Sequence, residues 1–265
     1  MAVLSSSARH GGQTAPVAAA TPATALTSVV LAQASPMLEP TPAADPTPSA
    51  WFVGSAPTPV AAAGSTNALA ARSFVVLGDS LSAWAFAPGS TSHSTSGVWP
   101  SLLAARDPLL SLANNAGVPG NTTGQMLARL QRDVLDCDPD MLFVLGGTND
   151  VGEDVPEATA LDNIRTIVET ARGQGITVVL LTMPPTNGQY ADLRVIKKQL
   201  NVDLADLARS EGVLLVDIDA VLSTPDGSLA ADYAAFDGLH LTQHGEQAVA
   251  DAVYRALHPT DLPRR

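Results

Sequence analysis

Short apolar runs alternate with longer amphipathic segments along most of the chain, beginning at Arg72. Continuous apolar runs of this kind, rich in Val, Ile and Leu, are typical of parallel strands that are covered on both faces. The pattern predicts strands at residues 74–77, 141–145, 176–181 and 213–216, with a weaker fifth at 109–113.

Between these runs, apolar residues recur at the spacing of an α-helix. The pattern predicts helices at residues 98–106, 123–135, 157–172, 190–209 and 242–257, the last with Thr242 as its N-cap. Because strand and helix alternate five times, we expect a three-layer α/β/α sandwich around a five-stranded, mainly parallel, doubly wound sheet. The sequence contains no internal repeat.

The first 70 residues have a different texture, dominated by Ala, Pro, Thr and Ser. Closely spaced prolines resist regular structure, so we expect a disordered leader at 1–70, a catalytic domain at 71–259 and a tail at 260–265. Residues 23–34 are mildly apolar and end in a small-residue motif that fits a signal cleavage site, although Pro22 precedes the run closely. A secreted or periplasmic location and an uncleaved cytoplasmic leader are therefore both open.

Composition narrows the range of partners. The net charge of −12 repels phosphate backbones and anionic lipid surfaces, so we expect no nucleic-acid partner. Since no segment reaches the ~20 continuous apolar residues of a membrane span, we also expect no stable membrane anchor. The single cysteine, Cys137, excludes an internal disulfide and a multi-thiolate metal site. The sequence leaves the oligomeric state undefined.

Polar motifs follow the predicted strands, where open parallel sheets bind their ligands. The four segments are 78–81 (Gly-Asp-Ser-Leu), 115–122 (Asn-Ala-Gly-Val-Pro-Gly-Asn-Thr), 146–150 (Gly-Gly-Thr-Asn-Asp) and 237–240 (Asp-Gly-Leu-His). A serine hydroxyl is a poor nucleophile until an imidazole takes its proton, and that imidazole needs an orienting group. If the loop forms one helix-like turn, Asp237 and His240 lie on the same face, and His240 would then face Ser80.

In order and in location, these segments resemble the four sequence blocks of the SGNH hydrolases, the superfamily that contains the GDSL lipases and esterases. The resemblance extends from about Arg72 to Leu257. It implies a flavodoxin-like fold and a serine ester hydrolase that forms an acyl-enzyme intermediate, without a cofactor or a metal. It also implies a catalytic triad that consists of Ser80, Asp237 and His240. For the oxyanion hole, it implies the backbone N–H groups of Ser80 and Gly120 and the side-chain amide of Asn149. Gly117 is close enough in sequence to be an alternative to Gly120.

Each motif residue also has a structural explanation. Ser80 would cap a helix, the glycines would serve a turn, and Asn149 would form an Asx turn. Taken jointly, the residues favour catalysis. The alternative from another class is a non-catalytic or metal-dependent α/β binding domain that uses Asp79, Asp150 and Asp217, but such a protein would not need the Asp237–His240 pair. We expect Asp79 and Asp150 to bond loop backbone groups instead.

The substrate is predicted less narrowly than the reaction. The family includes esterases, thioesterases, lysophospholipases and carbohydrate O-deacetylases, and the pocket decides among them. The segment that follows Ser80 is rich in Ser, Thr, Gly and Pro, and its large apolar residues are Trp84, Phe86 and Trp99. We therefore expect a small aromatic wall and a preference for short to medium acyl esters; the alternative is that these aromatics pack the loop onto the core.

Overall fold

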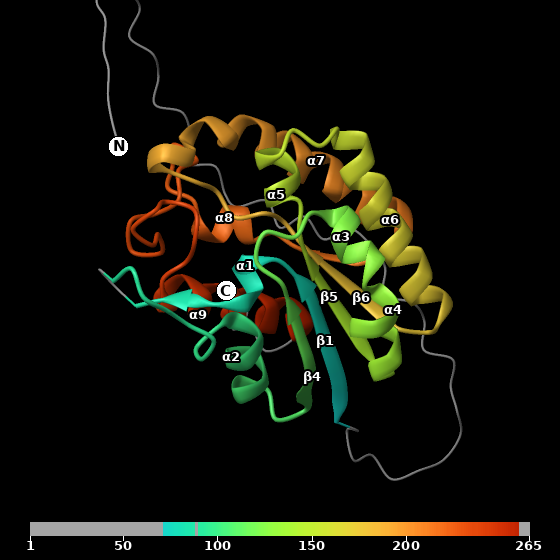
Figure 1. Ribbon diagram of the computed structural model, residues 1–265. Coiled ribbons are helices and arrows are strands. Elements are labelled where there is room, and N and C mark those ends of the chain that lie inside the picture. Colours follow the sequence, from blue (N-terminus) through green and yellow to red (C-terminus); the bar gives the residue numbers. More distant parts are fainter. Residues whose placement is uncertain (1–70, 88–89, 260–265) are drawn as a thin grey trace, which may run out of the picture. The chain divides into compact units, whose positions relative to one another are not determined.

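A computed structural model of the chain describes residues 71–87 and 90–259. The predicted leader, its signal-like segment and the tail lie outside the described residues. Five strands form one parallel sheet in the order β4-β1-β5-β6-β7 (Figure 1). Their bounds are β1 Arg72–Gly78, β4 Leu110–Gly117, β5 Met141–Leu145, β6 Thr177–Leu181 and β7 Leu214–Val216. The predicted α/β fold class is confirmed, and every neighbouring pair in this sheet is parallel.

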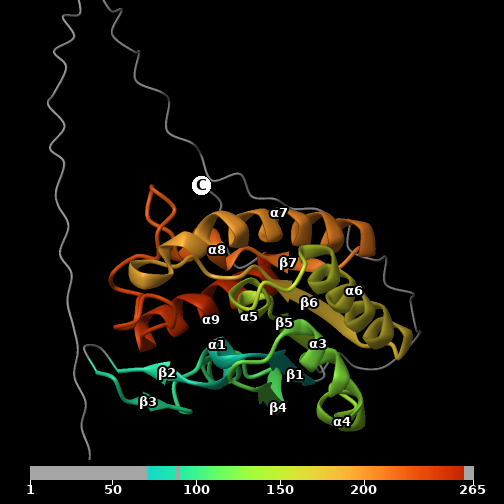
Figure 2. The same cartoon turned by 45° about the horizontal axis from the view of Figure 1, so that its top comes forward.

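Helices cover both faces of the sheet (Figure 2). On one face, Phe74 and Val76 of β1 pack with side chains of α2 (Trp99–Arg106), α8 (Ile218–Leu222) and α9 (Gln243–Leu257). On the other face, Val75 and Leu77 pack with α3 (Thr123–Ala128), α4 (Leu130–Asp133), α6 (Glu157–Gly173) and α7 (Arg194–Glu211). Alternate residues of one strand thus enter two separate cores, which is why its sequence is a continuous apolar run.

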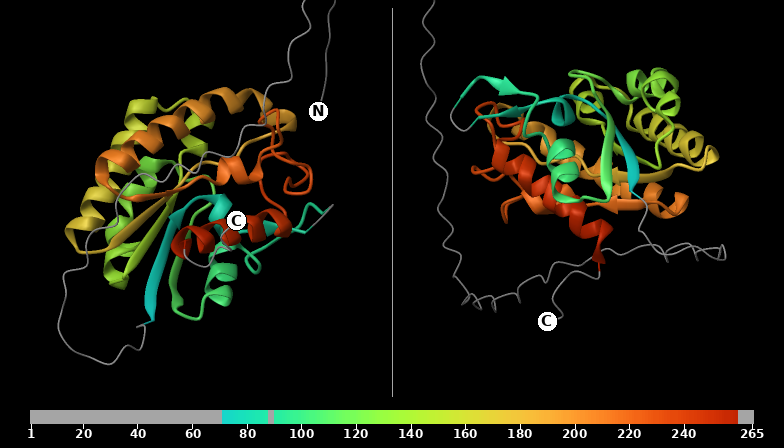
Figure 3. Two further views of the ribbon diagram at one scale, coloured as in Figure 1. Left: turned by 180° about the vertical axis from the view of Figure 1, so that it is seen from behind. Right: turned by 90° about the horizontal axis from the view of Figure 1, so that it is seen from below.

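Three predicted helices agree with the structure to within a few residues: α2, α6 and α9. Thr242 is the N-cap of α9 as expected, since its side chain accepts the backbone N–H of Gly245. Helix α2 has no cap from its own flanking residue; instead Glu246 of α9 accepts the Trp99 N–H through Oε2 at 2.8 Å. The two helices lie side by side on one face of the sheet (Figure 3).

Other helices differ from the prediction. The helix expected at 123–135 is divided into α3, α4 and a 3₁₀ turn, η1 (Leu135–Cys137). The two breaks lie at Arg129 (φ −111°, ψ 7°) and at Val134 (φ −123°, ψ −62°), where the backbone leaves helical geometry. The helix expected at 190–209 begins with a 3₁₀ segment, η2 (Gly188–Leu193), before α7. Short elements that periodicity does not reveal are α1 (Ser80–Ala83), α5 (Thr148–Gly152), α8 and the hairpin of β2 (Ala85–Phe86) with β3 (His93–Ser94).

Candidate active site

Ser80 lies in the turn that joins β1 to α1. Asp79 caps this helix, because its Oδ1 atom accepts the backbone N–H of Leu81 at 2.9 Å. Ser80 therefore occupies the first helical position, where its own backbone N–H has no intrahelical acceptor. The strand ends in Gly78, where a Cβ atom would lie 2.6 Å from Ser82 Oγ. The alternative role of Ser80 as the helix cap is thus wrong, and its hydroxyl has a different partner.

That partner is the imidazole of His240. His240 Nε2 lies 2.9 Å from Ser80 Oγ, and His240 Nδ1 lies 2.6 Å from Asp237 Oδ2. The structure therefore brings the three predicted triad residues into one hydrogen-bonded row. Ser80 is 8% exposed and the His240 side chain 16%, so the row is largely shielded from bulk water but reachable from it.

The segment from Asp237 to His240 is not the helix-like turn that the spacing suggests. It is an Asx turn, in which Asp237 Oδ1 accepts the backbone N–H groups of Leu239 and His240 at 3.0 Å each. Gly238 between them has φ +74°. Partial burial raises the pKa of the Asp237 carboxyl, but the hydrogen bonds from the His240 ring and from the two backbone N–H groups outweigh it and hold the pKa below its ordinary value. Asp237 is thus a carboxylate that orients the ring.

The two candidate glycines have different surroundings. Gly117, at the end of β4, donates its N–H to Asn115 Oδ1 at 3.2 Å, and a Cβ atom there would lie 2.8 Å from the backbone nitrogen of Ala83. Gly120 lies in the following loop with φ +79°, and its N–H has no hydrogen-bond partner among the described residues. Gly117 therefore allows β4 to pack closely against α1, whereas Gly120 offers an unused donor.

Asn149 lies in α5, directly after β5. Its Nδ2 atom donates to the carbonyl oxygen of Asn121 at 2.9 Å and to Asp79 Oδ2 at 3.3 Å. These two bonds orient the amide beside the Ser80 turn and beside the loop that carries Gly120. The side chain is therefore held by the site itself and not by an Asx turn of its own.

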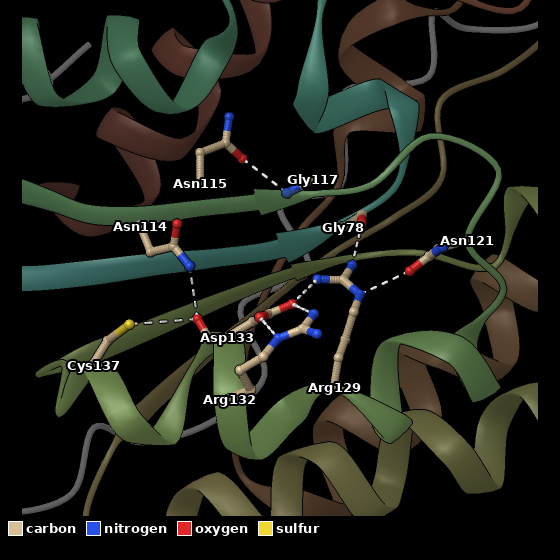
Figure 4. Close-up of polar contacts among 9 residues, drawn as sticks. All are labelled: Gly78, Asn114, Asn115, Gly117, Asn121, Arg129, Arg132, Asp133 and Cys137. Carbon is tan, nitrogen blue, oxygen red and sulfur yellow. Dashed lines mark hydrogen bonds and ion pairs between the residues drawn. The ribbon is translucent and has the colours of Figure 1, made fainter.

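Arg129 joins the two loops that carry these groups (Figure 4). Its Nη2 atom donates to the Gly78 carbonyl at 2.8 Å, its Nε atom to Asn121 Oδ1 at 2.7 Å, and its Nη1 atom to Asp133 Oδ2 at 2.9 Å. The carbonyl oxygen of Asn121 in turn accepts the Asn149 amide. The Arg129 guanidinium therefore holds both the turn before Ser80 and the residue that orients Asn149. Sequence reasoning missed this residue, since an arginine in a helical pattern is most often a solvated surface side chain.

Two carboxylates and an ammonium are buried beneath the site. Asp79 accepts from the Leu81 N–H and Asp150 accepts from the Thr123 N–H, so both bond backbone groups as expected, but these groups lie in the first turns of α1 and α3 and not in loops. Burial raises the pKa of Asp79 to about 6, against the hydrogen bond from Leu81 and the charge of Lys197. Lys197 is 2% exposed, its Nζ atom has no hydrogen-bond partner among the described residues, and burial lowers its pKa to about 8.

The predicted aromatic wall is only partly present. Trp99 is fully buried against Phe143 and donates its Nε1 proton to Ser82 Oγ at 3.3 Å, so the prediction that it lines the substrate pocket is wrong. Its position at the first turn of α2 turns the ring into the core. Trp84 and Phe86 do lie beside His240, with ring centroids 6.2 and 5.4 Å from the imidazole.

Residues considered as metal ligands have other partners. Asp217 accepts from Thr182 Oγ1 and from the Ala220 N–H as the N-cap of α8. Within residues 71–87 and 90–259, no group of three or more His, Cys, Asp or Glu side chains is arranged to hold a metal ion. No helix in the described ranges is both long enough and apolar enough to cross a bilayer.

Known proteins resemble parts of this chain in sequence and in fold. The chain is 32% identical over 137 residues to an arylesterase from Vibrio mimicus, a match that spans 49% of this chain and 64% of the relative, which is less than two thirds of its length. The lipase/acylhydrolase from Enterococcus faecalis superposes with a TM-score of 0.59 at 24% identity, covering 73% of this chain and 99% of that one. An acetyl xylan esterase from Geobacillus stearothermophilus gives a TM-score of 0.58 at 22% identity, covering 74% and 98%.

The profile of one family matches most of the described residues. Residues 76–248 match the GDSL-like Lipase/Acylhydrolase family, a span that begins within β1, ends within α9 and includes all four polar motifs. Since this span exceeds half of the chain, it identifies the family without reference to any single relative. The chain belongs to the GDSL-like lipase/acylhydrolase family.

Proposed function

We propose that the protein is a carboxylic ester hydrolase that uses Ser80 as its nucleophile, His240 as its general base and Asp237 as the group that orients His240. The observation that carries this proposal is the row of two short hydrogen bonds, 2.9 Å from Ser80 Oγ to His240 Nε2 and 2.6 Å from His240 Nδ1 to Asp237 Oδ2. Family membership supports the same chemistry.

In the first half of the reaction, Ser80 Oγ attacks the ester carbonyl while His240 Nε2 takes the hydroxyl proton. The carboxylate of Asp237 keeps the other proton on Nδ1 and stabilises the imidazolium. His240 then gives its proton to the leaving alcohol oxygen, and the carbon–oxygen bond to the alcohol breaks. In the second half, a water molecule attacks the acyl-enzyme with the same proton transfers, which releases the acid and restores Ser80.

Three donors are proposed to stabilise the tetrahedral oxyanion: the N–H of Ser80, the N–H of Gly120 and the Asn149 amide. The free N–H of Gly120 favours it over Gly117. The amide of Asn149 donates to two acceptors, and we expect the longer bond, 3.3 Å to Asp79, to give way to the oxyanion. Loss of one such donor costs roughly 100- to 1000-fold in rate.

We propose short to medium acyl esters as substrates. Two hollows in the described part of the chain, of about 190 and 200 Å³, both lie against α7, and neither is lined by Ser80 or His240. Neither hollow therefore holds the acyl chain, and the proposed preference rests on the segment after Ser80, which is rich in Ser, Thr, Gly and Pro and supplies no long apolar lid. Thioesters, lysophospholipids and acetylated carbohydrates are alternative substrates for the same triad, and the acetyl xylan esterase neighbour favours the last of these.

The test is hydrolysis of p-nitrophenyl acetate by the purified protein and by Ser80→Ala. We expect the variant to lose roughly 10⁴-fold or more in kcat, because no other group replaces the nucleophile. Ser210→Ala is the matched control, since this serine bonds the Leu207 carbonyl within α7 and should leave the rate unchanged. A variant at position 80 that keeps more than a few per cent of the rate contradicts the proposal, and a loss of rate with a chelator favours the metal-dependent alternative.

A further inference from the structure

Aromatic rings form a continuous series of contacts beside His240. Trp84 and His93 are 4.2 Å apart between ring centroids, Phe86 and His93 are 5.7 Å apart, and Phe86 and Phe236 are 5.6 Å apart. Trp84 and Phe86 also contact the His240 imidazole. Neither His93 nor Phe236 belongs to the four polar motifs, and sequence reasoning named neither of them.

Backbone hydrogen bonds fix these rings relative to His240. Phe86 and His93 pair across the β2–β3 hairpin (Figure 2). The Phe86 N–H donates to the carbonyl of Leu241, the residue after His240. Phe236 precedes Asp237 in a loop that is closed by the bond from the Ala235 N–H to the His240 carbonyl at 2.8 Å. The hairpin and the loop are therefore tied to the same segment as the proposed base.

The rings differ in how much of them reaches solvent. Phe86 is buried and supports the imidazole, Trp84 is half-buried, and His93 is exposed. Phe236 is 63% exposed although it directly precedes Asp237. An apolar ring held at the edge of an active site contributes little to the core, so its exposed face is available to a ligand.

We propose that Trp84, His93 and Phe236 form the subsite for the alcohol portion of the ester, and that this subsite binds an aromatic ring. The proposal rests on the ester hydrolysis proposed above. His240 must protonate the leaving oxygen, so the alcohol group lies next to His240, and the rings contact that imidazole. The acyl carbonyl, in contrast, faces the donors on Ser80, Gly120 and Asn149.

An aromatic ligand suits this surface better than an alkyl chain. Aromatic pairs favour tilted or edge-to-face contacts, and the ring planes here already meet at 44° to 70°. A ligand ring against Phe236 and Trp84 would extend the same arrangement. Such a contact contributes about 0.5–1.5 kcal/mol beyond the burial of area, which corresponds to roughly 2- to 12-fold in binding.

The experiment compares benzyl acetate with cyclohexylmethyl acetate, two esters of primary alcohols that share an acyl group and differ in the aromaticity of the ring. For Phe236→Leu and for His93→Ala, we expect kcat/KM on benzyl acetate to fall roughly 2- to 12-fold, mainly through KM, and the value for the cyclohexyl ester to change by less than the benzyl value. Phe236→Tyr keeps the ring and should keep the preference. Benzyl alcohol should inhibit the two ring-removing variants less than it inhibits the wild type.

The control is Val202→Ala, which removes an apolar side chain that is 52% exposed on α7 and should leave both esters unaffected. Equal losses on the two esters in Phe236→Leu, or an unchanged benzyl preference, would overturn the subsite. If either ring-removing variant changes the ratio of kcat/KM for ethyl acetate to kcat/KM for ethyl hexanoate, the rings lie on the acyl side, which would also overturn the subsite. If the folded wild type hydrolyses no ester at all, the proposed function fails, a result distinct from any of these.

Discussion

Gly238 decides whether Asp237 and His240 meet. Its φ of +74° closes the Asx turn, and its Cα lies so close to Asn187 that an added Cβ would be 2.6 Å from the Asn187 carbonyl oxygen. The Asn187 N–H also donates to the Gly238 carbonyl at 2.8 Å. A side chain at this position would therefore strain the backbone and push the loop away from Asn187, which moves Asp237 and His240 relative to Ser80.

We expect Gly238→Ala to reduce kcat/KM for p-nitrophenyl acetate by about 100-fold or more, because a misplacement of about 1 Å in the reacting groups has that effect. The matched control is Gly227→Ala, since Gly227 has φ +78° but no atom within 4 Å of an added Cβ. Both variants should lose about 1–2 kcal/mol of unfolding free energy from the left-handed backbone. Equal rates in the two variants would show that the contact with Asn187 does not hold the loop.

Site residues that stand in short sequence motifs could be predicted, whereas residues whose position depends on tertiary contacts could not. Ser80 could be predicted because it follows the end of β1, and Asp237 and His240 because their spacing matches that of a base with its orienting carboxylate. Trp99 was misassigned because proximity to Ser80 in sequence does not determine which way a ring points. Phe236 was missed for the opposite reason, since it is far from Ser80 in sequence and meets the Phe86 ring only in the folded chain.

Among the elements, α2 depends on a residue of α9. Glu246 is fully buried, its Oε2 atom accepts the Trp99 N–H at 2.8 Å, and its Oε1 atom has no partner among the described residues. Burial raises the pKa of this carboxyl well above its ordinary value of 4.5, against the hydrogen bond from Trp99. Glu246 is therefore a protonated carboxylic acid in the folded protein over a pH range in which it is ionised in the unfolded chain.

The pH dependence of stability follows from this difference. Between pH 4.5 and the raised pKa, the folded state holds a proton that the unfolded state has released, so the unfolding free energy falls as the pH rises. Glu246→Gln keeps an acceptor for the Trp99 N–H but does not titrate. We expect the two proteins to be similar in melting temperature near pH 4 and the Gln variant to become increasingly more stable towards pH 7 and above.

Two further variants test this reasoning by thermal unfolding at several pH values. Glu169→Gln, an exposed position on α6, should show no such pH-dependent gain. Glu246→Ala removes the cap as well as the titration, so it should be about 0.5–2 kcal/mol less stable than Glu246→Gln at every pH. A constant difference between Glu246→Gln and the wild type across the pH range would mean that the buried carboxyl is ionised in the folded state.

The strands could be predicted because burial on both faces leaves a continuous apolar run, whereas the short elements leave none. Helix α3 ends where Arg129 turns aside to bond Gly78 and Asn121, a tertiary effect that helical periodicity does not encode. The β2–β3 hairpin forms in a segment rich in Ser and Thr, and it is positioned by the bond from Phe86 to Leu241. Contacts distant in sequence therefore determine the boundaries that the pattern misjudged.

In the molecule as a whole, residues from Arg72 onwards supply every strand of the five-stranded sheet and both apolar cores. The same region contains each residue proposed for the triad, the oxyanion hole and the aromatic subsite. The sheet brings together the ends of β1, β4 and β5, which is why motifs more than 60 residues apart in sequence share one edge. Fold and proposed site are thus properties of one continuous region.

It follows that removal of residues 1–70 should leave both the melting temperature and kcat/KM on p-nitrophenyl acetate nearly unchanged. A segment of Ala, Pro, Thr and Ser with few large apolar residues can bury little surface on the domain. Trp51 and Phe52 are the exceptions, so removal of residues 1–49, which keeps them, is the matched control. If the longer truncation alone lowers the melting temperature by several degrees, a shift that corresponds to about 1 kcal/mol or more, then the Trp51–Phe52 segment packs on the domain and the leader is not a separate unit.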